Sequence, residues 1–282
     1  MQSGATVTVI IVHLNGPRVI DRCIRSLRSI KGCEMHIVVV DNGSTDDSVA
    51  VLSCLHPDIS IISTRRNLGF SCGVNTGIRQ ALAHESEYVW ILNNDTIVTP
   101  NSLSAMLMKM HADEAIGLVG STLIEEEKGC RVEIKGGWVN FFTGLPSNTQ
   151  TTPPDSPIEY VKGASILLRT KALRHVGLFD ESFFLYWEDT DLCFRLRAQG
   201  WKLEIAEDSI VYHQGQGSLA HNAALWDYHF TRSSVIFFSK HATFPLLPIG
   251  FSVAGRLAKR LMSRKWSHAA AILKALTGAA YR

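Results

Sequence analysis

The chain has 282 residues, 46% of them hydrophobic, so it can bury one large core or one domain with an appendage. Its six cysteines lack C-x-x-C spacing and no signal peptide begins the chain, which favours reduced thiols in a cytoplasmic protein over a disulfide framework. The net charge of +2 conceals an asymmetry, because the part from Tyr228 onward has nine Lys or Arg and no Asp or Glu.

The first two apolar runs, Val7–Val12 and Met35–Val40, predict strands that are buried on both faces. Between them, one helical face gathers apolar side chains, which predicts a βαβ unit; these are Val19, Ile20, Cys23, Ile24 and Leu27. Asp41 follows the second strand, where its carboxylate can accept hydrogen bonds from a ribose or a base edge. Ser44 and Asp47 have the spacing of a capping box, so the same turn also has a structural interpretation.

A third predicted strand, Ile59–Thr64, leads into a segment rich in glycine and asparagine that extends to Gly77. Such residues permit a ligand to approach the backbone closely. The chain contains neither G-x-G-x-x-G nor G-x-x-x-x-G-K-[ST], which disfavours a dinucleotide oxidoreductase and a P-loop phosphotransferase.

The fourth predicted strand, Tyr88–Leu92, ends in Asn93-Asn94-Asp95. In open α/β sheets, ligands bind beyond the carboxyl ends of the strands. Oxygen ligands at this point would suit Mg²⁺ or Mn²⁺ bound together with a diphosphate. Alternatively, these residues cap a helix that begins near Asn101.

Further along the chain, the segment from Glu125 to Pro157 is predicted to be an irregular loop, and Tyr160–Leu168 a strand. Gly163 would allow that strand to pass close to a ligand. An acidic triplet, Glu188, Asp189 and Asp191, follows among aromatic residues. Acids also favour the start of a helix, and we expect that structural role for Asp191.

The basic end of the chain is predicted to contain an amphipathic helix from Phe251. Its apolar face would hold Phe251, Ala254, Leu257, Ala258, Leu261 and Met262, and its basic face Arg256, Lys259, Arg260 and Arg264. This pattern predicts attachment to an anionic membrane surface, and the apolar part is too short to span a bilayer. The alternative is a tail packed on the rest of the chain. No RNA-binding motif is present, so nucleic acid is not an expected partner.

Several of these motifs occur together in a characteristic order: Val-Val-Asp-Asn-Gly-Ser-Thr-Asp, Asn-Leu-Gly-Phe with Asn-Thr-Gly, Leu-Asn-Asn-Asp, Gly-Leu-Phe-Asp-Glu, Glu-Asp-Thr-Asp-Leu and Val-Tyr-His. From about residue 6 to residue 240 the chain resembles family 2 glycosyltransferases of the GT-A fold, especially bacterial rhamnosyltransferase-like members. The resemblance implies an α/β fold, a Rossmann-like, mostly parallel mixed sheet flanked by helices. It implies a domain over residues 1–240, with a nucleotide-sugar half (1–100) and an acceptor half (101–240), followed by a basic helical appendage at 241–282.

The resemblance also implies the site residues. The metal ligands would be Asp95 and His213, although a histidine at a strand end has the alternative role of a simple hydrogen-bonding residue. Asn93 replaces the first aspartate of the D-x-D motif, so the cation would depend more on the diphosphate. The residues implied to bind the nucleotide sugar are Val12, Asp41, Asn67, Gly69, Asn75, Asn93, Asn94 and Gly163. The usual Thr-Tyr-Asn ending of the first strand is replaced by His13-Leu14-Asn15, so the aromatic residue near the base is missing.

By the same resemblance, Asp189 would be the base that removes a proton from the acceptor hydroxyl. An ordinary aspartate has a pKa of about 3.9, and burial among aromatic rings beside Glu188 and Asp191 would raise it. Glu188 would orient the acceptor, and Trp187 would stack on a sugar face.

The function implied is inverting sugar transfer to a lipid-linked or polysaccharide acceptor in cell-surface glycan synthesis. The enzyme would be peripheral on the inner face of the bacterial cell membrane. The resemblance favours dTDP-rhamnose as the donor, with a UDP-sugar as the alternative. A hypothesis of another class is a catalytically silent, membrane-attached protein that binds sugar nucleotides.

Overall fold

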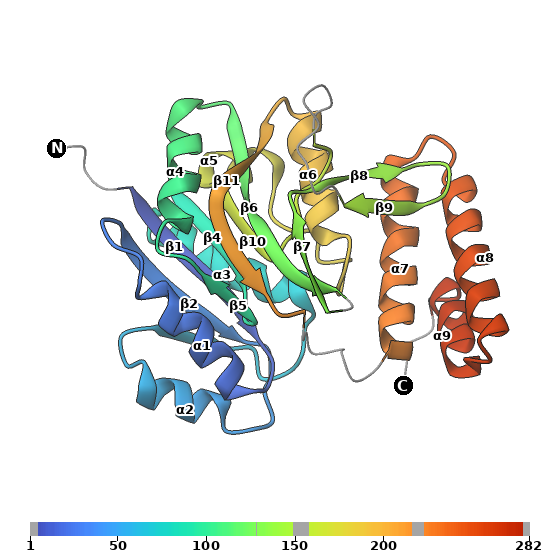
Figure 1. The fold of residues 1–282 in the computed structure, drawn as a ribbon, viewed down its shortest axis with the longest axis horizontal. Helices are drawn as coiled ribbons and strands as arrows, with labels where there is room; N and C mark the ends of the chain where they lie inside the picture. The colour runs from blue at the N-terminus through green and yellow to red at the C-terminus, as the bar shows by residue number, and fades with distance from the viewer. Residues whose placement is uncertain (1–4, 128, 149–157, 216–222, 279–282) are drawn as a thin grey trace.

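The computed structural model describes residues 5–127, 129–148, 158–215 and 223–278. Its main feature is a nine-stranded sheet in the order β3-β2-β1-β4-β10-β6-β11-β5, with β7 paired to β6 (Figure 1). A separate two-stranded sheet consists of β8 and β9. The predicted mixed, mostly parallel α/β architecture is confirmed.

The first half of the chain forms the parallel part of this sheet. Its elements are β1 (Thr6–His13), α1 (Pro17–Leu27), β2 (Glu34–Asp41), α2 (Ser48–Leu55), β3 (Ser60–Ser63), α3 (Phe70–Ala83) and β4 (Tyr88–Asn93). The predicted βαβ unit is confirmed, because β1 lies between β2 and β4 and runs parallel to both. The capping box predicted after β2 is wrong: α2 begins at Ser48, whose backbone N–H donates to Asp46.

The second half adds antiparallel strands and extends the sheet. Its elements are β5 (Thr96–Val98), α4 (Ser102–Ala112), β6 (Ile116–Glu127), β7 (Cys130–Ile134), β8 (Gly137–Asn140), β9 (Leu145–Asn148), β10 (Ser165–Arg169), α5 (Thr170–Val176), α6 (Glu188–Ala198) and β11 (Lys202–His213). The irregular loop predicted from Glu125 is therefore wrong up to Asn148, and residues 149–157 lie outside the described part. The strand predicted to start at Tyr160 begins only at Ser165.

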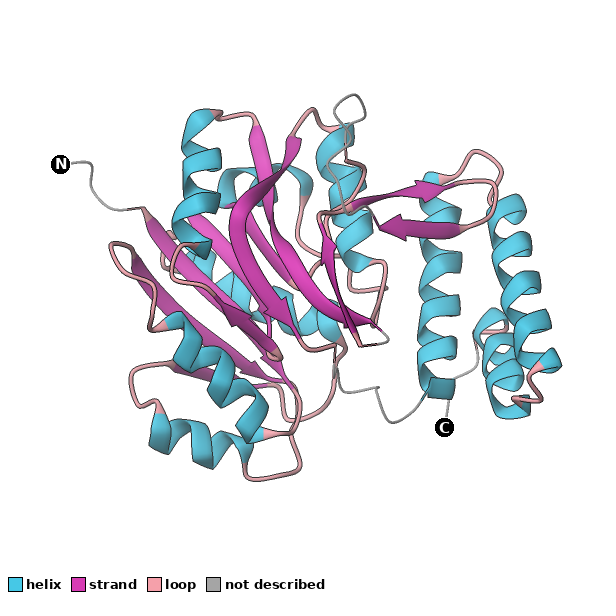
Figure 2. Ribbon diagram, viewed as in Figure 1, coloured by secondary structure: helices cyan, strands magenta, loops and turns pink. Residues whose placement is uncertain are grey.

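Two hydrophobic layers cover the sheet, because the apolar strands present side chains to both faces (Figure 2). On one face, Val9 and Ile11 of β1 pack with α1 and α4. On the other face, Ile10 packs in the layer that contains α3, α5 and α6. This double cover leaves the carboxyl ends of the parallel strands as the place where polar side chains gather.

Three helices follow the sheet: α7 (Ala223–His241), α8 (Leu246–Met262) and α9 (Trp266–Leu276). The C-terminal part of α7 packs against the sheet domain, since its Phe237 and Phe238 are fully buried in the hydrophobic cluster on that side of the sheet. None of the helices in the described part of the chain combines the length and apolar content that a bilayer span requires.

Candidate active site

The carboxyl ends of β2, β1 and β4 bring three predicted site residues to one edge of the sheet. In the strand register, Val12 of β1 is paired with Asn93 of β4, and the next residue, His13, is paired with Asp41 of β2. The sequence separations are large, but the parallel register places these residues on neighbouring strands. The candidate site therefore begins where the sequence predicted it, at the ends of the buried strands.

Asp41 is buried and already anchored, because its two carboxylate oxygens accept hydrogen bonds from Ser44 N and Ser63 Oγ, both at 3.0 Å. Asn42, which the sequence analysis did not select, braces the following loop. Its side-chain amide donates to Asn67 Oδ1 at 3.1 Å and accepts from the backbone N–H of Leu68 at 3.0 Å. The Asp-Asn-Gly turn signal was present, but it did not reveal which chain segment the asparagine would hold.

Gly69 and Asn75 contact the chain segment that precedes α6, at Phe184 and Phe179 respectively. A Cβ on Gly69, which has φ +86°, would lie 2.6 Å from the carbonyl oxygen of Phe184. Asn75 is buried, donates to the carbonyl of Phe179 at 2.8 Å and accepts from its N–H at 3.0 Å. The amide of Asn75 is thus engaged at both ends, so we do not retain it as a nucleotide ligand.

Asp95 lies in the turn between β4 and β5, and not at the start of α4. The helix-cap alternative is wrong, because β5 separates this turn from the helix and Ser102 Oγ accepts a hydrogen bond from the N–H of Thr99. Asp95 is 4% exposed, and its Oδ2 atom is buried with no hydrogen-bond partner among the described residues. A buried carboxylate oxygen that lacks a partner is available for a cation.

His213 approaches the same carboxylate from the end of β11. Its Nε2 atom lies 3.3 Å from Asp95 Oδ1 and 3.3 Å from Asn93 Nδ2. Burial lowers the pKa of His213, but hydrogen bonds to Asp95 and Glu125 and the charges of those acids outweigh it and raise this pKa to about 9. The structure thus brings together Asn93, Asp95 and His213 as predicted.

Glu125 is a site residue that the sequence analysis missed. His213 Nδ1 donates to Glu125 Oε1 at 2.6 Å, and Lys162 Nζ donates to the same oxygen at 2.5 Å. Burial opposes ionisation, but His213 and Lys162 lower the pKa of Glu125 to about 2. The carboxylate therefore remains charged and fixes the orientation of the imidazole ring.

His13 occupies the place where the sequence departs from the family pattern. It is fully buried, and its Nδ1 atom accepts a hydrogen bond from Asn94 Nδ2 at 3.0 Å. Burial lowers the pKa of His13, so the ring is held neutral. Its Nε2 atom is buried without a hydrogen-bond partner. His13 therefore orients Asn94, which precedes Asp95 in the turn between β4 and β5.

The donor set fits a hard divalent cation that is completed by its substrate. In the described part of the chain no three His, Cys, Asp or Glu side chains are grouped so that they alone could hold a metal ion. A Mg²⁺ or Mn²⁺ ion usually takes only one or two carboxylates from the protein and the remaining ligands from phosphate and water. The unpartnered Oδ2 of Asp95 is consistent with such a shared site, and His213 could join it by releasing the proton that its raised pKa retains.

Asp189 is positioned at the first turn of α6. Its Oδ2 accepts a hydrogen bond from the N–H of Gly163 at 2.7 Å, and its Oδ1 accepts one from the N–H of Thr190 at 2.6 Å. A Cβ on Gly163 would lie 3.1 Å from Asp189 Cβ, so glycine permits this close approach. Burial raises the pKa of Asp189 despite these hydrogen bonds. The carboxyl group has the environment expected of a general base.

The residues around Asp189 differ in their roles. Burial and the charge of Asp189 raise the pKa of Glu188 well above its usual value, and its Oε2 atom has no partner. Asp191 is buried and structural, since it accepts hydrogen bonds from Arg195 and His241, both at 2.8 Å.

Trp187 is 4% exposed and packs on Phe237 with ring centroids 4.8 Å apart. It presents no open face, so we do not retain it as a sugar-stacking residue. Partly exposed rings nearby are Phe230, whose centroid lies 5.7 Å from that of Trp187, and Tyr186 and Trp226, whose centroids are 5.7 Å apart. Tyr186 and Trp187 have φ values of 69° and 70°, an uncommon left-handed pair that turns the chain directly into α6.

A continuous chain of contacts joins the two halves of the site. Asp95 contacts His213, His213 contacts Glu125, and Glu125 contacts Lys162. The next residue, Gly163, donates its N–H to Asp189. The Asp95 turn and Asp189 are therefore linked by one series of polar contacts through residues of β11 and β6 and the Lys162–Gly163 segment.

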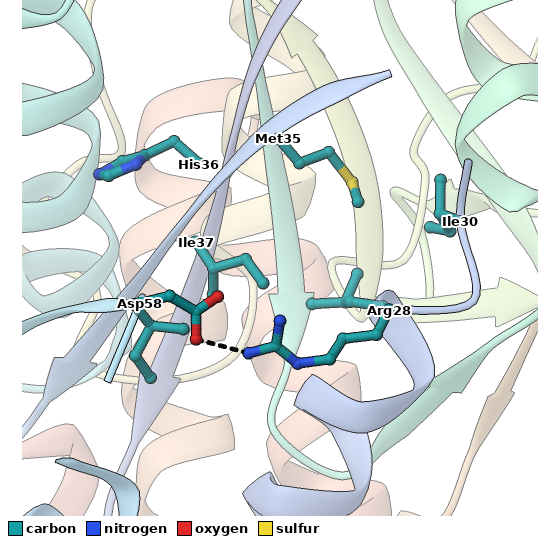
Figure 3. A pocket seen from close by; sticks show the side chains of 8 residues that line it. Arg28, Ile30, Met35, His36, Ile37 and Asp58 are labelled. Atoms are coloured by element: carbon teal, nitrogen blue, oxygen red, sulfur yellow. Dashed lines mark hydrogen bonds and ion pairs between the residues drawn. The ribbon is translucent and has the colours of Figure 1, made fainter. Parts of the chain in front are cut away.

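A cavity of about 230 Å³ lies elsewhere, at the amino end of β2 (Figure 3). Its lining includes Met35 and His36, and the ion pair between Arg28 and Asp58, 2.6 Å long, crosses it. Because ligands of open α/β sheets bind at the carboxyl ends of strands, this cavity is not part of the candidate active site.

Several known glycosyltransferases are similar to this chain. The chain is 26% identical to N-acetylglucosaminyl-diphospho-decaprenol L-rhamnosyltransferase of Mycobacterium tuberculosis, over 89% of this chain and 90% of that protein. It is 23% identical to the dTDP-rhamnosyl transferase RfbF of Shigella flexneri, over 66% and 62% of the two chains.

Among solved structures, the mannosyltransferase PcManGT from Pyrobaculum calidifontis in complex with GDP-Man and Mn²⁺ superimposes with a TM-score of 0.62 at 17% identity, covering 100% of this chain and 77% of that one. S. aureus TarS in complex with UDP has a TM-score of 0.59 at 16% identity, covering 92% and 73%. The glycosyl transferase family 2 model matches residues 8–173. The chain therefore belongs to glycosyl transferase family 2.

Proposed function

We propose that this glycosyltransferase moves rhamnose from dTDP-rhamnose, with inversion, to a hydroxyl group of a lipid-linked acceptor in cell-surface glycan synthesis. The observation that carries the proposal is the series of contacts that joins Asp95 and His213 to Asp189, which supports a cation site and a base close together. The rhamnosyl donor is supported by the similarity to the M. tuberculosis and S. flexneri rhamnosyltransferases.

The nucleotide-sugar half, residues 1–100, would bind the donor along the ends of β1, β2 and β4. Asp41 is fixed where it can accept hydrogen bonds from the nucleoside. Val12 and Asn93 lie beside it on adjacent strands. Among the described residues, the side-chain hydrogen bonds of Asn67 are made by Oδ1, so its Nδ2 group could contact a ligand. Gly69 acts by close packing, and not by direct donor contact.

The catalytic step requires a negative leaving group on one side and a proton acceptor on the other. Asp95 and His213 would hold Mg²⁺ or Mn²⁺, which supplies neutralisation of the diphosphate charge when bound. Asp189 would take the proton of the acceptor hydroxyl. At the same time the hydroxyl oxygen forms a bond to the anomeric carbon, and the bond between that carbon and the diphosphate breaks. Burial and the charge of Asp189 raise the pKa of Glu188, so a protonated Glu188 could donate a hydrogen bond to the acceptor.

The acceptor half would comprise residues 101–240, and residues 241–282 would form the basic appendage. Tyr186, which lies three residues before Asp189, and Trp226, whose ring packs beside that of Tyr186, are partly exposed, so they replace Trp187 as candidates to contact the acceptor sugar. A lipid-linked acceptor would place the enzyme peripherally on the inner face of the cell membrane.

A donor panel tests the proposal. The protein is assayed with dTDP-rhamnose and UDP-glucose, with Mn²⁺, Mg²⁺ or excess chelator, and N-acetylglucosaminyl-diphospho-polyprenol as acceptor. We expect metal-dependent transfer from dTDP-rhamnose. Asp95→Ala should abolish both transfer and metal-dependent nucleotide binding, whereas Asp208→Ala, a change at an exposed position of β11, should not. Undiminished transfer in chelator would refute the metal role, and transfer only from UDP-glucose would replace the donor. Metal-dependent binding that is unchanged in His213→Ala would remove that histidine from the site.

A further inference from the structure

Helix α8 leaves several large apolar side chains exposed and turns two of its arginines toward α7, unlike a usual surface helix, which turns its apolar face inward. Leu247, Phe251 and Met262 are 41%, 51% and 81% exposed, and Ala254 and Ala258 between them are exposed as well. Large apolar side chains gathered on one face of a protein commonly mark a contact surface.

Two basic residues of α8, Arg256 and Arg260, point toward α7. The acceptor of Arg260 is a buried aspartate of α7. Asp227 is fully buried, and Arg260 donates to its two oxygens at 2.9 and 3.2 Å. His268 of α9 lies 2.7 Å from the same carboxylate. Arg256 donates to Thr231 Oγ1 at 2.8 Å. The prediction that Arg256 and Arg260 form a free basic face is therefore wrong, because both are used to hold the three helices together.

The β8–β9 hairpin extends the exposed apolar surface. The ring of Phe142, which is 56% exposed, lies 4.7 Å from the ring of Phe251. Gly144, at φ +69°, packs so closely that a Cβ there would collide with the carbonyl oxygen of Pro248. Figure 1 shows the turn of this hairpin beside the first turns of α8. Two segments about one hundred residues apart in the sequence thus form one surface, called here the hairpin–α8 surface: Phe142, Leu145, Leu247, Phe251 and Met262.

The charge around the hairpin–α8 surface identifies its occupant. Lys259, Arg264 and Lys265 are exposed at the far end of α8, beside Trp266, which is 67% exposed. Neither the hairpin, residues 137–148, nor the chain from Tyr228 onward contains an acidic residue. Exposed apolar and aromatic side chains beside uncompensated cations fit the interface of an anionic lipid bilayer.

We propose that the hairpin–α8 surface enters the headgroup region of an anionic membrane with its apolar side chains first, while Lys259, Arg264 and Lys265 contact lipid phosphates. This proposal rests on the proposed function in one respect: a lipid-linked acceptor requires the enzyme at a membrane. It changes the mode of attachment, because burial of apolar side chains, and not a basic helical face alone, holds the protein there.

The test is co-sedimentation of the full chain with vesicles of phosphatidylglycerol and phosphatidylcholine, and with phosphatidylcholine alone. We expect binding to the anionic vesicles that persists in part at 0.5 M salt, where charge attraction is largely screened. The double variant Leu247→Ser/Phe251→Ser should bind at least about tenfold more weakly. The matched control is Met108→Ser, which removes an exposed apolar side chain from the distant helix α4.

Three results would overturn the proposal: full vesicle binding by the double variant, complete release of the wild type at 0.5 M salt, or concentration-dependent dimers that the double variant abolishes without vesicle binding by the wild type. The last would make the surface an interface between copies of the chain. Mn²⁺-dependent dTDP binding is measured on the same samples. It should be unchanged in the double variant, and its absence in the wild type would count against the proposed function independently of the vesicle result.

Discussion

Replacing Glu125 should weaken the metal site without removing a metal ligand. The Glu125 side chain is 14% exposed and accepts a 2.6 Å hydrogen bond from His213 Nδ1, so it fixes the ring whose other nitrogen faces Asp95. Loss of such a supporting carboxylate typically weakens metal binding about 10- to 100-fold. Because tenfold corresponds to about 1.4 kcal/mol, Glu125→Ala should cost the metal complex about 1.4 to 2.7 kcal/mol.

The assay is calorimetric titration of dTDP at several Mn²⁺ concentrations, from which the apparent metal affinity is obtained. Glu126→Ala is the matched control, since Glu126 is the adjacent residue of β6 and is exposed. Lys162→Ala should have a smaller effect, because it removes the ion pair to Glu125 but leaves the Glu125–His213 hydrogen bond. Equal metal affinity in Glu125→Ala and Glu126→Ala, with both proteins folded, would refute the role assigned to Glu125.

Three further predictions concern stability. Burial and Arg232 lower the pKa of His229 from 6.5 to about 4, so the native state should lose stability as the pH falls from about 6.5 toward 4, and urea unfolding should show a smaller loss in His229→Leu. Asp227→Ala leaves the partly buried guanidinium group of Arg260 without its carboxylate partner and should lower the free energy of unfolding by about 3–5 kcal/mol, whereas Asp208→Ala should change it by less than about 0.5 kcal/mol; equal values would show that the Asp227 network contributes nothing. Gly69→Ala adds a Cβ 2.6 Å from the Phe184 carbonyl oxygen and should lower the melting temperature by several degrees, and an unchanged value would contradict the close packing described.

The sequence predicted those parts of the site that depend on strand ends. The apolar runs before Asp41 and Asn93 identify buried strands, and a parallel sheet necessarily brings their carboxyl ends together. The acidic triplet was also interpretable, because acids at a helix start and a base among aromatic rings are both local patterns. The structure adds a hydrogen bond from the N–H of Gly163 to Asp189. The sequence had predicted that Gly163 approaches a ligand, and not that it contacts Asp189.

Contacts between strands distant in the chain were not predictable from local pattern. Glu125 contacts His213 because β6 and β11 pair in parallel, with Ile124 opposite Tyr212. The sequence around Glu125 and His213 does not indicate this register. Similarly, Asn75 has the same neighbours in the sequence whether it binds a ligand or the Phe179 backbone.

Helix α8 shows a second reason why the sequence alone could not predict the structure. Its periodicity correctly separates apolar from basic positions, but periodicity cannot say which face is turned inward. The buried carboxylate of Asp227 decides this by pairing with Arg260, and burial of a charge is tolerated when it is paired and hydrogen-bonded.

The most direct test of the proposed mechanism is the rate of rhamnosyl transfer by Asp189→Asn, measured together with its Mn²⁺-dependent affinity for dTDP. Both carboxylate oxygens of Asp189 accept hydrogen bonds from backbone N–H groups. The amide has nearly the same size, but it keeps only one acceptor oxygen and loses the ability to accept the hydroxyl proton. We predict unchanged nucleotide and metal affinity and transfer that is slower by about 10²- to 10⁴-fold. Transfer at the wild-type rate would contradict the assignment of Asp189 as the base.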